Sequence, residues 1–218
     1  MNNGIIVILG TAHLSTTPGK CSPDGRFREY AYSRKVVGEI ADTLRKEGYT
    51  VFIDYIAPDP SSAMKGSTWK QEQSRELAYR VNFVNNICAK YGKRNCIYVS
   101  VHTDAAGADG RWHNASGLSV RVSPKGSEAS KQLARCIYEA AEKEGREVTG
   151  NRAVPPGKFW PQSLYVLNNT ACPAVLTESL FQDNRQDVDF LLSERGRAAI
   201  VRLHVEGIKA YVAKYGKK

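Results

Sequence analysis

The chain has 218 residues, of which 42% are hydrophobic and 24% charged, a composition that is typical of a folded globular protein and excludes intrinsic disorder. No apolar run approaches the roughly 20 residues of a membrane-spanning helix, so a membrane span is not expected. The net charge of +9 favours a polyanionic partner, such as nucleic acid, an acidic membrane or an anionic cell-wall polymer, or else it only aids solubility, since the basic residues are spread along the chain.

The first half of the chain alternates apolar runs with segments of helical periodicity. The predicted elements are, in order, a buried strand at residues 4–9, a helix at 29–46, a strand at 49–54, a helix at 69–91 and a strand at 96–101. A polar, turn-rich loop at residues 15–27 separates the first strand from its helix. It is long for such a connection, and long loops in compact domains are often functional.

The second half continues the same alternation. The predicted elements are an edge strand at residues 117–123, a helix at 127–144, strands at 163–167 and 173–177, a helical turn at 187–192 and a final helix at 194–215. Residues 146–162, rich in proline, glycine and basic side chains, predict a surface loop beside a site. The pattern predicts an α/β fold with a single mixed, mostly parallel sheet of about six strands and helices on both faces.

The five cysteines are scattered and none forms a CxxC pair, which argues against a disulfide framework and against a thiolate zinc site. Cys88 and Cys136 fall on the apolar faces of predicted helices, and Cys96 opens a buried strand, so we interpret them as small buried hydrophobic residues. A reducing compartment of synthesis is the simplest inference. The amino terminus has no basic segment before its apolar run, so no signal peptide is expected.

Chemistry-bearing side chains follow three of the predicted buried strands. His13 comes just after the first strand, His102 directly follows the strand at residues 96–101, and Glu178 directly follows the strand at 173–177. In open α/β sheets, functional residues gather at the carboxyl ends of the strands. Glu29, which opens the first helix at that end, could complete a two-histidine, one-glutamate zinc site, and Glu178 would be placed to act as general base.

Each of these residues also has a simpler interpretation. A single histidine at a strand end is more often an ordinary loop residue, and an acid such as Glu29 in the first turn of a helix is favoured by the helix dipole alone. His113, in a long loop, is a reserve metal ligand. His204 lies beside the apolar face of the last helix, so we interpret it as structural.

Four segments together resemble the zinc-dependent N-acetylmuramoyl-L-alanine amidases of the Amidase_3 family. They are Ala-His at residues 12–13, Arg-Glu at 28–29, SVHTDA at 100–105, and LYVL with PAVLTESLFQDN at 164–184. Their order, spacing and predicted secondary structure match the family along essentially the whole chain. The family's Asp-x-Gly-His-Gly turn is replaced by Gly-Thr-Ala-His-Leu at residues 10–14, so either Ala12 adopts a backbone conformation that glycine usually supplies or the turn differs.

The resemblance implies a zinc enzyme that cleaves the amide between N-acetylmuramic acid and L-alanine in peptidoglycan. It further implies that residues 1–218 are a single catalytic domain without a separate wall-binding module. His13, Glu29 and His102 would bind Zn²⁺, and Glu178 would be catalytic. Two further side chains could donate to the oxyanion and bind substrate, namely Arg152 and Asn168.

Three alternatives remain open at this stage. The chain could be another zinc hydrolase, such as a peptidoglycan carboxypeptidase, a wall-cutting Cys-His peptidase, or a non-enzymatic polyanion-binding module. For the amidase we expect a peptidoglycan or muropeptide substrate, no nucleic-acid partner and a monomer. It would act at the bacterial cell wall, either as a phage-type lysin made in the cytoplasm or as a secreted protein that has been trimmed.

Overall fold

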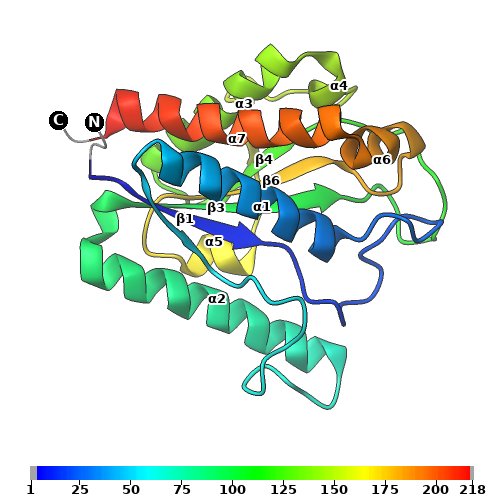
Figure 1. Cartoon of the computed structure of the whole chain (residues 1–218), viewed down its shortest axis with the longest axis horizontal. Coiled ribbons are helices and arrows are strands. Elements are labelled where there is room, and N and C mark those ends of the chain that lie inside the picture. Colours follow the sequence, from blue (N-terminus) through cyan, green and yellow to red (C-terminus); the bar gives the residue numbers. More distant parts are fainter. Residues whose placement is uncertain (1–3, 217–218) are drawn as a thin grey trace.

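Six strands of the described residues, 4–216, form one hydrogen-bonded sheet in this computed structural model (Figure 1). They are β1 (Ile6–Thr11), β2 (Thr50–Ile53), β3 (Cys96–Asp104), β4 (Ser119–Val122), β5 (Trp160–Pro161) and β6 (Ala174–Phe181). Their order across the sheet is β2-β1-β3-β6-β4-β5, and the neighbours are parallel except for β4 and β6. The predicted α/β class with a mixed, mostly parallel sheet is therefore confirmed.

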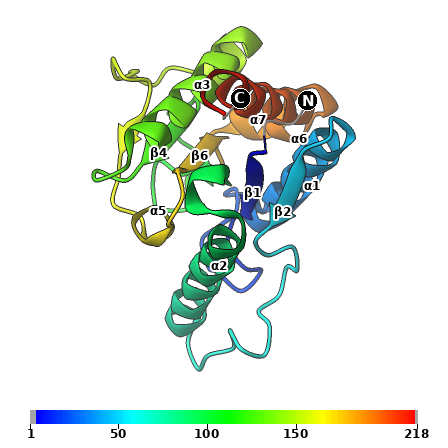
Figure 2. The same ribbon diagram turned by 90° about the vertical axis from the view of Figure 1, so that its left-hand side faces the viewer.

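Helices cover both faces of the sheet. They are α1 (Glu29–Lys46), α2 (Trp69–Tyr91), α3 (Glu128–Glu144), α4 (Arg146–Thr149), α5 (Tyr165–Asn169), α6 (Arg185–Leu192) and α7 (Glu194–Tyr215), with a 3₁₀ turn at Lys93–Asn95. Side chains alternate along the strands, so Val7 and Leu9 face a core shared with α1, α3 and α7, while Ile6 and Ile8 face a second core shared with α2 and α5. Figure 2 shows these two helix layers from the end of the sheet at which β1 begins.

The long helices begin where the sequence predicts them to begin. Thr68 and Ser193 precede α2 and α7, and their hydroxyl oxygens accept hydrogen bonds from the amides of Gln71 and Gly196. Such capping satisfies amides that have no partner inside the helix. Among the described residues, no helix is long and apolar enough to cross a membrane.

One predicted strand, at residues 163–167, is wrong. Residues 165–169 form the short helix α5 instead, because local side chains close a helical turn: the amide of Asn169 donates to the Tyr165 carbonyl over 2.8 Å, and the Thr170 hydroxyl donates to the Val166 carbonyl. The predicted loop at residues 146–162 is also only partly correct, since it contains α4 and the edge strand β5.

The topology creates a crevice between β1 and β3. From β1 the chain crosses to β2 on one side, whereas from β3 the sheet continues to β6 on the other. Ligands of open α/β sheets bind at such a reversal of strand order, beyond the carboxyl ends of the strands. The crevice lies where β1 leads to His13 and where β3 carries His102.

Candidate metal centre and its pocket

His13, Glu29 and His102 lie together at this crevice. One ligand atom from each residue lies within 4.8 Å of the other two. Nε2 of His13 is 3.3 Å from Oε2 of Glu29, and Nδ1 of His102 is 3.1 Å from Oε1 of the same carboxylate. The structure thus brings together the three residues that the sequence singled out from β1, α1 and β3.

The carboxylate of Glu29 is buried and has one oxygen left over. Its Oε1 accepts hydrogen bonds from His102 and from the backbone amide of Thr103, over 3.1 Å. Its Oε2 makes no well-formed hydrogen bond within the described residues and has only two ion-pair neighbours, Nε2 of His13 at 3.3 Å and Nζ of Lys20 at 4.0 Å. A buried carboxylate oxygen without a donor is costly, because it has lost its contact with water.

A divalent metal ion fits this donor set. Two imidazole nitrogens and one carboxylate oxygen are typical of a catalytic site with an open fourth position. Ligand bonds of about 2.1 Å in a tetrahedron separate the ligand atoms by about 3.4 Å. Nδ1 of His102 lies 3.1 Å from Oε1 and Nε2 of His13 lies 3.3 Å from Oε2, so each spacing is close to that value, and an ion would also bind Oε2.

Burial and the neighbouring charges shift the acid–base properties of the cluster. Burial lowers the pKa of His102, which favours the neutral imidazole that a metal needs. Burial alone would raise the pKa of Glu29, but His13 and His102 outweigh it and hold that pKa well below its usual range. The cluster is therefore suited to an ionised carboxylate between imidazoles.

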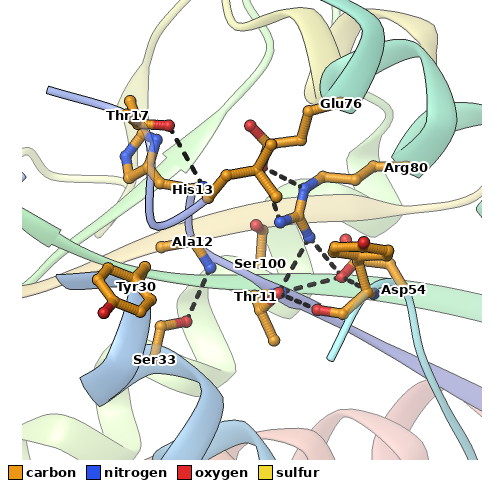
Figure 3. Close-up of polar contacts among 12 residues, drawn as sticks. Thr11, Ala12, His13, Thr17, Tyr30, Ser33, Asp54, Glu76, Arg80 and Ser100 are labelled. Carbon is orange, nitrogen blue, oxygen red and sulfur yellow. Dashed lines mark hydrogen bonds and ion pairs between the residues drawn. The ribbon is translucent and has the colours of Figure 1, made fainter. Parts of the chain in front are cut away.

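The turn that carries His13 is held by the helix that carries Glu29. His13 has a φ of 42°, an unusual value for a residue other than glycine. Arg34 of α1 donates to the backbone carbonyls of Ala12 and His13, each over 2.8 Å. The Ala12 amide donates to the Ser33 hydroxyl over 2.8 Å, as Figure 3 shows. Of the two outcomes expected for Ala12, a glycine-like backbone or a different turn, the structure has the second: the positive φ falls on His13, and Ala12 is fully buried.

Glu178 lies within β6 rather than after it. It is level with His102 on β3, so both side chains project from the α2/α5 face of the sheet. No hydrogen bond from another described residue reaches its carboxyl group. Burial, together with the negative charges of Asp104 and Glu29, raises the pKa of Glu178 well above its usual range. A carboxyl group with a raised pKa in a pocket is a candidate for proton transfer.

These residues line one pocket of about 350 Å³. Its walls come from the ends of β1, β3 and β6, from the start of α1, from one side of α2 and from residues 162–166. Lys20, from the long loop at residues 15–27, also lines it, with Nζ 4.0 Å from Oε2 of Glu29. The prediction that this loop is functional therefore gains a structural basis.

A second polar cluster borders the same pocket. Arg80 of α2 donates through Nη1 to Asp54, over 2.6 Å, and through Nε to Glu76, over 2.9 Å (Figure 3). Asp54 also accepts a hydrogen bond from the Tyr98 hydroxyl over 2.8 Å, and the three charged side chains are almost completely buried. Sequence reasoning missed this cluster, although Asp54 follows β2 at the same end of the sheet as His13.

The other candidates from the sequence lie elsewhere. Arg152 forms an ion pair with Asp104, which lines the pocket, so it stands behind the pocket wall. Asn168 is not part of the lining: its amide accepts a hydrogen bond from Ser123 and donates one to Ser163. His113 is paired with Asp109, away from the metal cluster.

His204 is fully buried in α7, which agrees with a structural role. Its Nδ1 donates to the carbonyl of Ile200 over 2.7 Å, which leaves Nε2 to accept from the Thr177 hydroxyl over 2.8 Å. Burial lowers its pKa to about 4, so the ring is neutral near pH 7.

The sequence matches a known family along nearly its whole length. The model of the Amidase_3 family, described as N-acetylmuramoyl-L-alanine amidase, matches residues 7–210. An endolysin of Bacillus phage SPP1 is 30% identical over 112 residues, which are 51% of this chain and 38% of that endolysin. The match thus spans well under half of the endolysin's length.

Solved structures share the fold. The CwlD amidase of Clostridioides difficile, solved in complex with the GerS lipoprotein, superposes with a TM-score of 0.79 at 21% identity, covering 96% of this chain and 99% of that one. An N-acetylmuramoyl-L-alanine amidase of Clostridium difficile 630 gives a TM-score of 0.78 at 19% identity, covering 98% and 100%. At these identities the similarity establishes the fold alone.

Proposed function

Because the chain belongs to the Amidase_3 family of N-acetylmuramoyl-L-alanine amidases, we propose that it hydrolyses the amide between N-acetylmuramic acid and L-alanine in peptidoglycan. The observation that carries the proposal is the His13–Glu29–His102 cluster, whose buried Oε2 makes no hydrogen bond within the described residues, in a pocket that also contains Glu178. The proposed metal is zinc, for which two histidines and one glutamate are a known catalytic ligand set.

Zinc held by these three residues supplies a Lewis acid, which makes hydroxide available at neutral pH and polarises the carbonyl group that is attacked. The chain's own part of the chemistry is proton transfer by Glu178. Its carboxylate takes the proton from the attacking water and then gives it to the amine of L-alanine as that amine leaves. The raised pKa of Glu178 suits this exchange, since the group can carry the proton between the two steps.

The surroundings of Glu178 support its role in a second way. Asp104 is two residues beyond His102 on β3, and Arg121 and Arg152 both form ion pairs with it. These pairs hold Asp104 in place beside Glu178, where its negative charge helps to raise the pKa of Glu178. Arg152 thus acts through Asp104 in this proposal, and a direct contact of Arg152 with substrate remains a prediction. The placement of Asn168 outside the pocket lining gives its predicted substrate role no support.

We further propose that the enzyme acts on the bacterial cell wall, in the manner of a phage lysin. The partial match to a phage endolysin supports this setting. The net charge of +9 would help the protein to accumulate on an anionic wall.

Digestion of purified muropeptides by the wild type and by Glu178→Gln tests the proposal. We expect free stem peptides that begin with L-alanine from the wild type, at a rate at least about 10³-fold above that of the variant. Bound zinc, measured by elemental analysis, should be equal in both proteins. Glu194→Gln, on the exposed first turn of α7, serves as the control and should be fully active.

Three results would contradict the proposal. Full activity of Glu178→Gln would show that Glu178 is not the proton carrier. Full activity of metal-free wild type would show that the reaction does not need zinc. Release of a carboxyl-terminal amino acid, with the muramoyl amide intact, would favour the carboxypeptidase alternative.

A further inference from the structure

A second hollow lies at the opposite end of the sheet from the metal centre. It has a volume of about 600 Å³ and is lined by residues before β3 and β6, by the start of α3 and by the end of α7. β3 begins at this hollow and reaches the metal centre at His102, six residues later, so the two sites are about 20 Å apart along the strand. The end view in Figure 2 faces this side of the molecule.

The hollow carries positive charge without compensation. Lys93, Arg94 and Lys125 line it, and all three are exposed. Among the described residues, none of the three forms an ion pair, and the lining includes no aspartate or glutamate. Some basic side chains at the surface have a carboxylate partner, as Arg195 has Glu147 and Arg202 has Glu144, whereas these three share one hollow and have none in the described part of the chain. Three unpaired cations that converge on one concavity attract an anion.

The remaining lining suits a phosphate group attached to a polyol. Ser127 caps α3, a helix of 17 residues, and the helix starts at the wall of the hollow, so its positive dipole end adds to the charge. Ser123, Thr170 and Asn168 add polar groups to the lining; each already makes at least one hydrogen bond within the protein, and their remaining oxygen lone pairs and the second amide N–H of Asn168 are left for a ligand. Hydroxyls and amides can exchange hydrogen bonds with a polyol.

Two tyrosines at the end of α7 complete the hollow. Tyr211 and Tyr215 both line it, and their ring centroids lie 5.4 Å apart. Aromatic surface next to cations favours a ligand that alternates apolar C–H surface with charge, as a chain of polyol phosphates does.

We propose that this hollow binds a segment of an anionic, phosphodiester-linked polyol polymer of the bacterial cell wall. Binding there would anchor the protein to its substrate layer through the catalytic domain itself. Because the metal pocket opens at the other end of the sheet, the anchored protein keeps that pocket free. The choice of a wall polymer over nucleic acid rests on the proposed function, whereas the anion site rests on the hollow alone.

Calorimetric titration of the full chain with poly(glycerol phosphate) tests the inference. The test variant replaces the three cations together, Lys93→Gln, Arg94→Gln and Lys125→Gln. The control variant removes the same charge from exposed lysines elsewhere, Lys35→Gln, Lys46→Gln and Lys143→Gln. We expect the test variant to bind at least about tenfold more weakly than the wild type, and the control variant to differ by less than about twofold. Thermal unfolding of both variants checks that they are folded.

Amide chemical shifts of the wild type locate the bound polymer even if the test variant fails to fold. We expect changes at Gly126 and Ser127 and none at His13 or His102. Equal losses in the two variants, shifts confined to the metal pocket, or no binding would overturn the inference.

Two further ligands define the occupant. If glycerol 3-phosphate binds as tightly as the polymer, the proposal of a polymer is wrong and the occupant is a small phosphorylated polyol. If a single-stranded oligonucleotide of equal charge binds more tightly than poly(glycerol phosphate), the proposal is wrong and the occupant is a nucleic acid. Amidase activity is no part of these measurements, so their failure would leave the proposed function untouched.

Discussion

Two buried polar clusters border the same pocket, and they differ in how completely their charges are paired. In the Asp54–Arg80–Glu76 cluster a guanidinium bridges two carboxylates. In the His13–Glu29–His102 cluster one carboxylate meets two imidazoles, and its Oε2 has no hydrogen-bond donor among the described residues. In the first cluster each carboxylate has a charged hydrogen bond to the guanidinium, as expected of a structural support. In the second, the partners of the carboxylate are imidazoles, which carry a positive charge only when protonated, so the cluster can accept a cation, which is a property of a binding site.

The largest effect is expected from breaking the His13–Glu29–His102 cluster. His102→Ala removes one of the three proposed ligands, and we expect zinc affinity to fall by more than about 100-fold, beyond the loss typical of outer-shell changes. Added zinc should raise the thermal unfolding temperature of the wild type and leave that of the variant unchanged, since only a binding-competent fold is stabilised by the metal.

His113→Ala is the matched control, because His113 is bound to Asp109 outside the cluster. Elemental analysis after dialysis measures the metal directly. A His102→Ala protein that retained stoichiometric zinc would remove His102 from the site.

Breaking the Asp54–Arg80–Glu76 cluster should reduce the stability of the fold instead. Arg80→Met leaves Asp54 and Glu76 buried without their cation, and we expect the free energy of unfolding to fall by about 3–5 kcal/mol. Urea unfolding at pH 7 gives this value. Arg202→Met, which breaks an exposed pair with Glu144, should cost less than about 1 kcal/mol. Equal effects of the two substitutions would show that the burial of the Arg80 cluster does not matter.

His204 is a buried polar group of a third kind, because its side chain is neutral, and it should make the stability of the fold depend on pH. The pKa of His204 is about 4 in the folded protein, compared with 6.5 for an exposed histidine. Between pH 4 and pH 6.5 the unfolded chain therefore binds a proton at this residue that the folded protein does not. Stability is therefore fully present above pH 6.5 and is lost as the pH falls towards 4. We expect a loss of about 2 kcal/mol by pH 5 and about 3 kcal/mol by pH 4 from this residue.

The measurement is urea unfolding between pH 7.5 and pH 4.5 for the wild type and for His204→Gln. The glutamine variant should lose less stability over that range, whatever its stability at pH 7.5. Parallel curves for the two proteins would assign the acid sensitivity to other groups.

The smallest effect is expected from Arg34, which holds the turn that carries His13. Arg34→Lys keeps the positive charge, but its three donors on a single nitrogen cannot replace a guanidinium whose three separate nitrogens bond to carbonyls of both the His13 turn and residues 56–57. We expect zinc affinity to fall by about tenfold, because the turn that carries His13 is less firmly held. Arg45→Lys, on the same helix, is the control and should bind zinc as the wild type does. Unchanged affinity in Arg34→Lys would mean that the turn holds its shape without the guanidinium.

Much of the fold could be predicted because the long elements have unambiguous periodicity and clear ends. The bounds of α1 and α2 agree with the predicted ranges, and the apolar runs at β1, β3 and β6 locate the centre of the sheet. The failure at residues 163–167 has a local cause. Leu-Tyr-Val-Leu has the composition of a strand, but Asn169 and Thr170 bond back to the preceding carbonyls and close a helical turn.

The site was predictable to the extent that strand order brings strand ends together. His13, His102 and Glu178 meet because β1, β3 and β6 are adjacent, and Glu29 joins them from the helix that follows β1. What the sequence could not reveal is pairing between distant side chains. Arg80 and Arg34 sit on helices without any local sign that each would be buried against residues from other segments.

The strand order also constrains how the protein can fold. The residues of the metal centre are far apart along the chain, and β6, with Glu178, can join β3 only after most of the chain is available. Contacts of such long sequence separation form slowly, because the intervening loops must first be closed. A nascent or truncated chain that lacks β6 cannot assemble the complete centre. Metal uptake during refolding would therefore report the pairing of β1 with β3, and the later appearance of activity would report the arrival of β6.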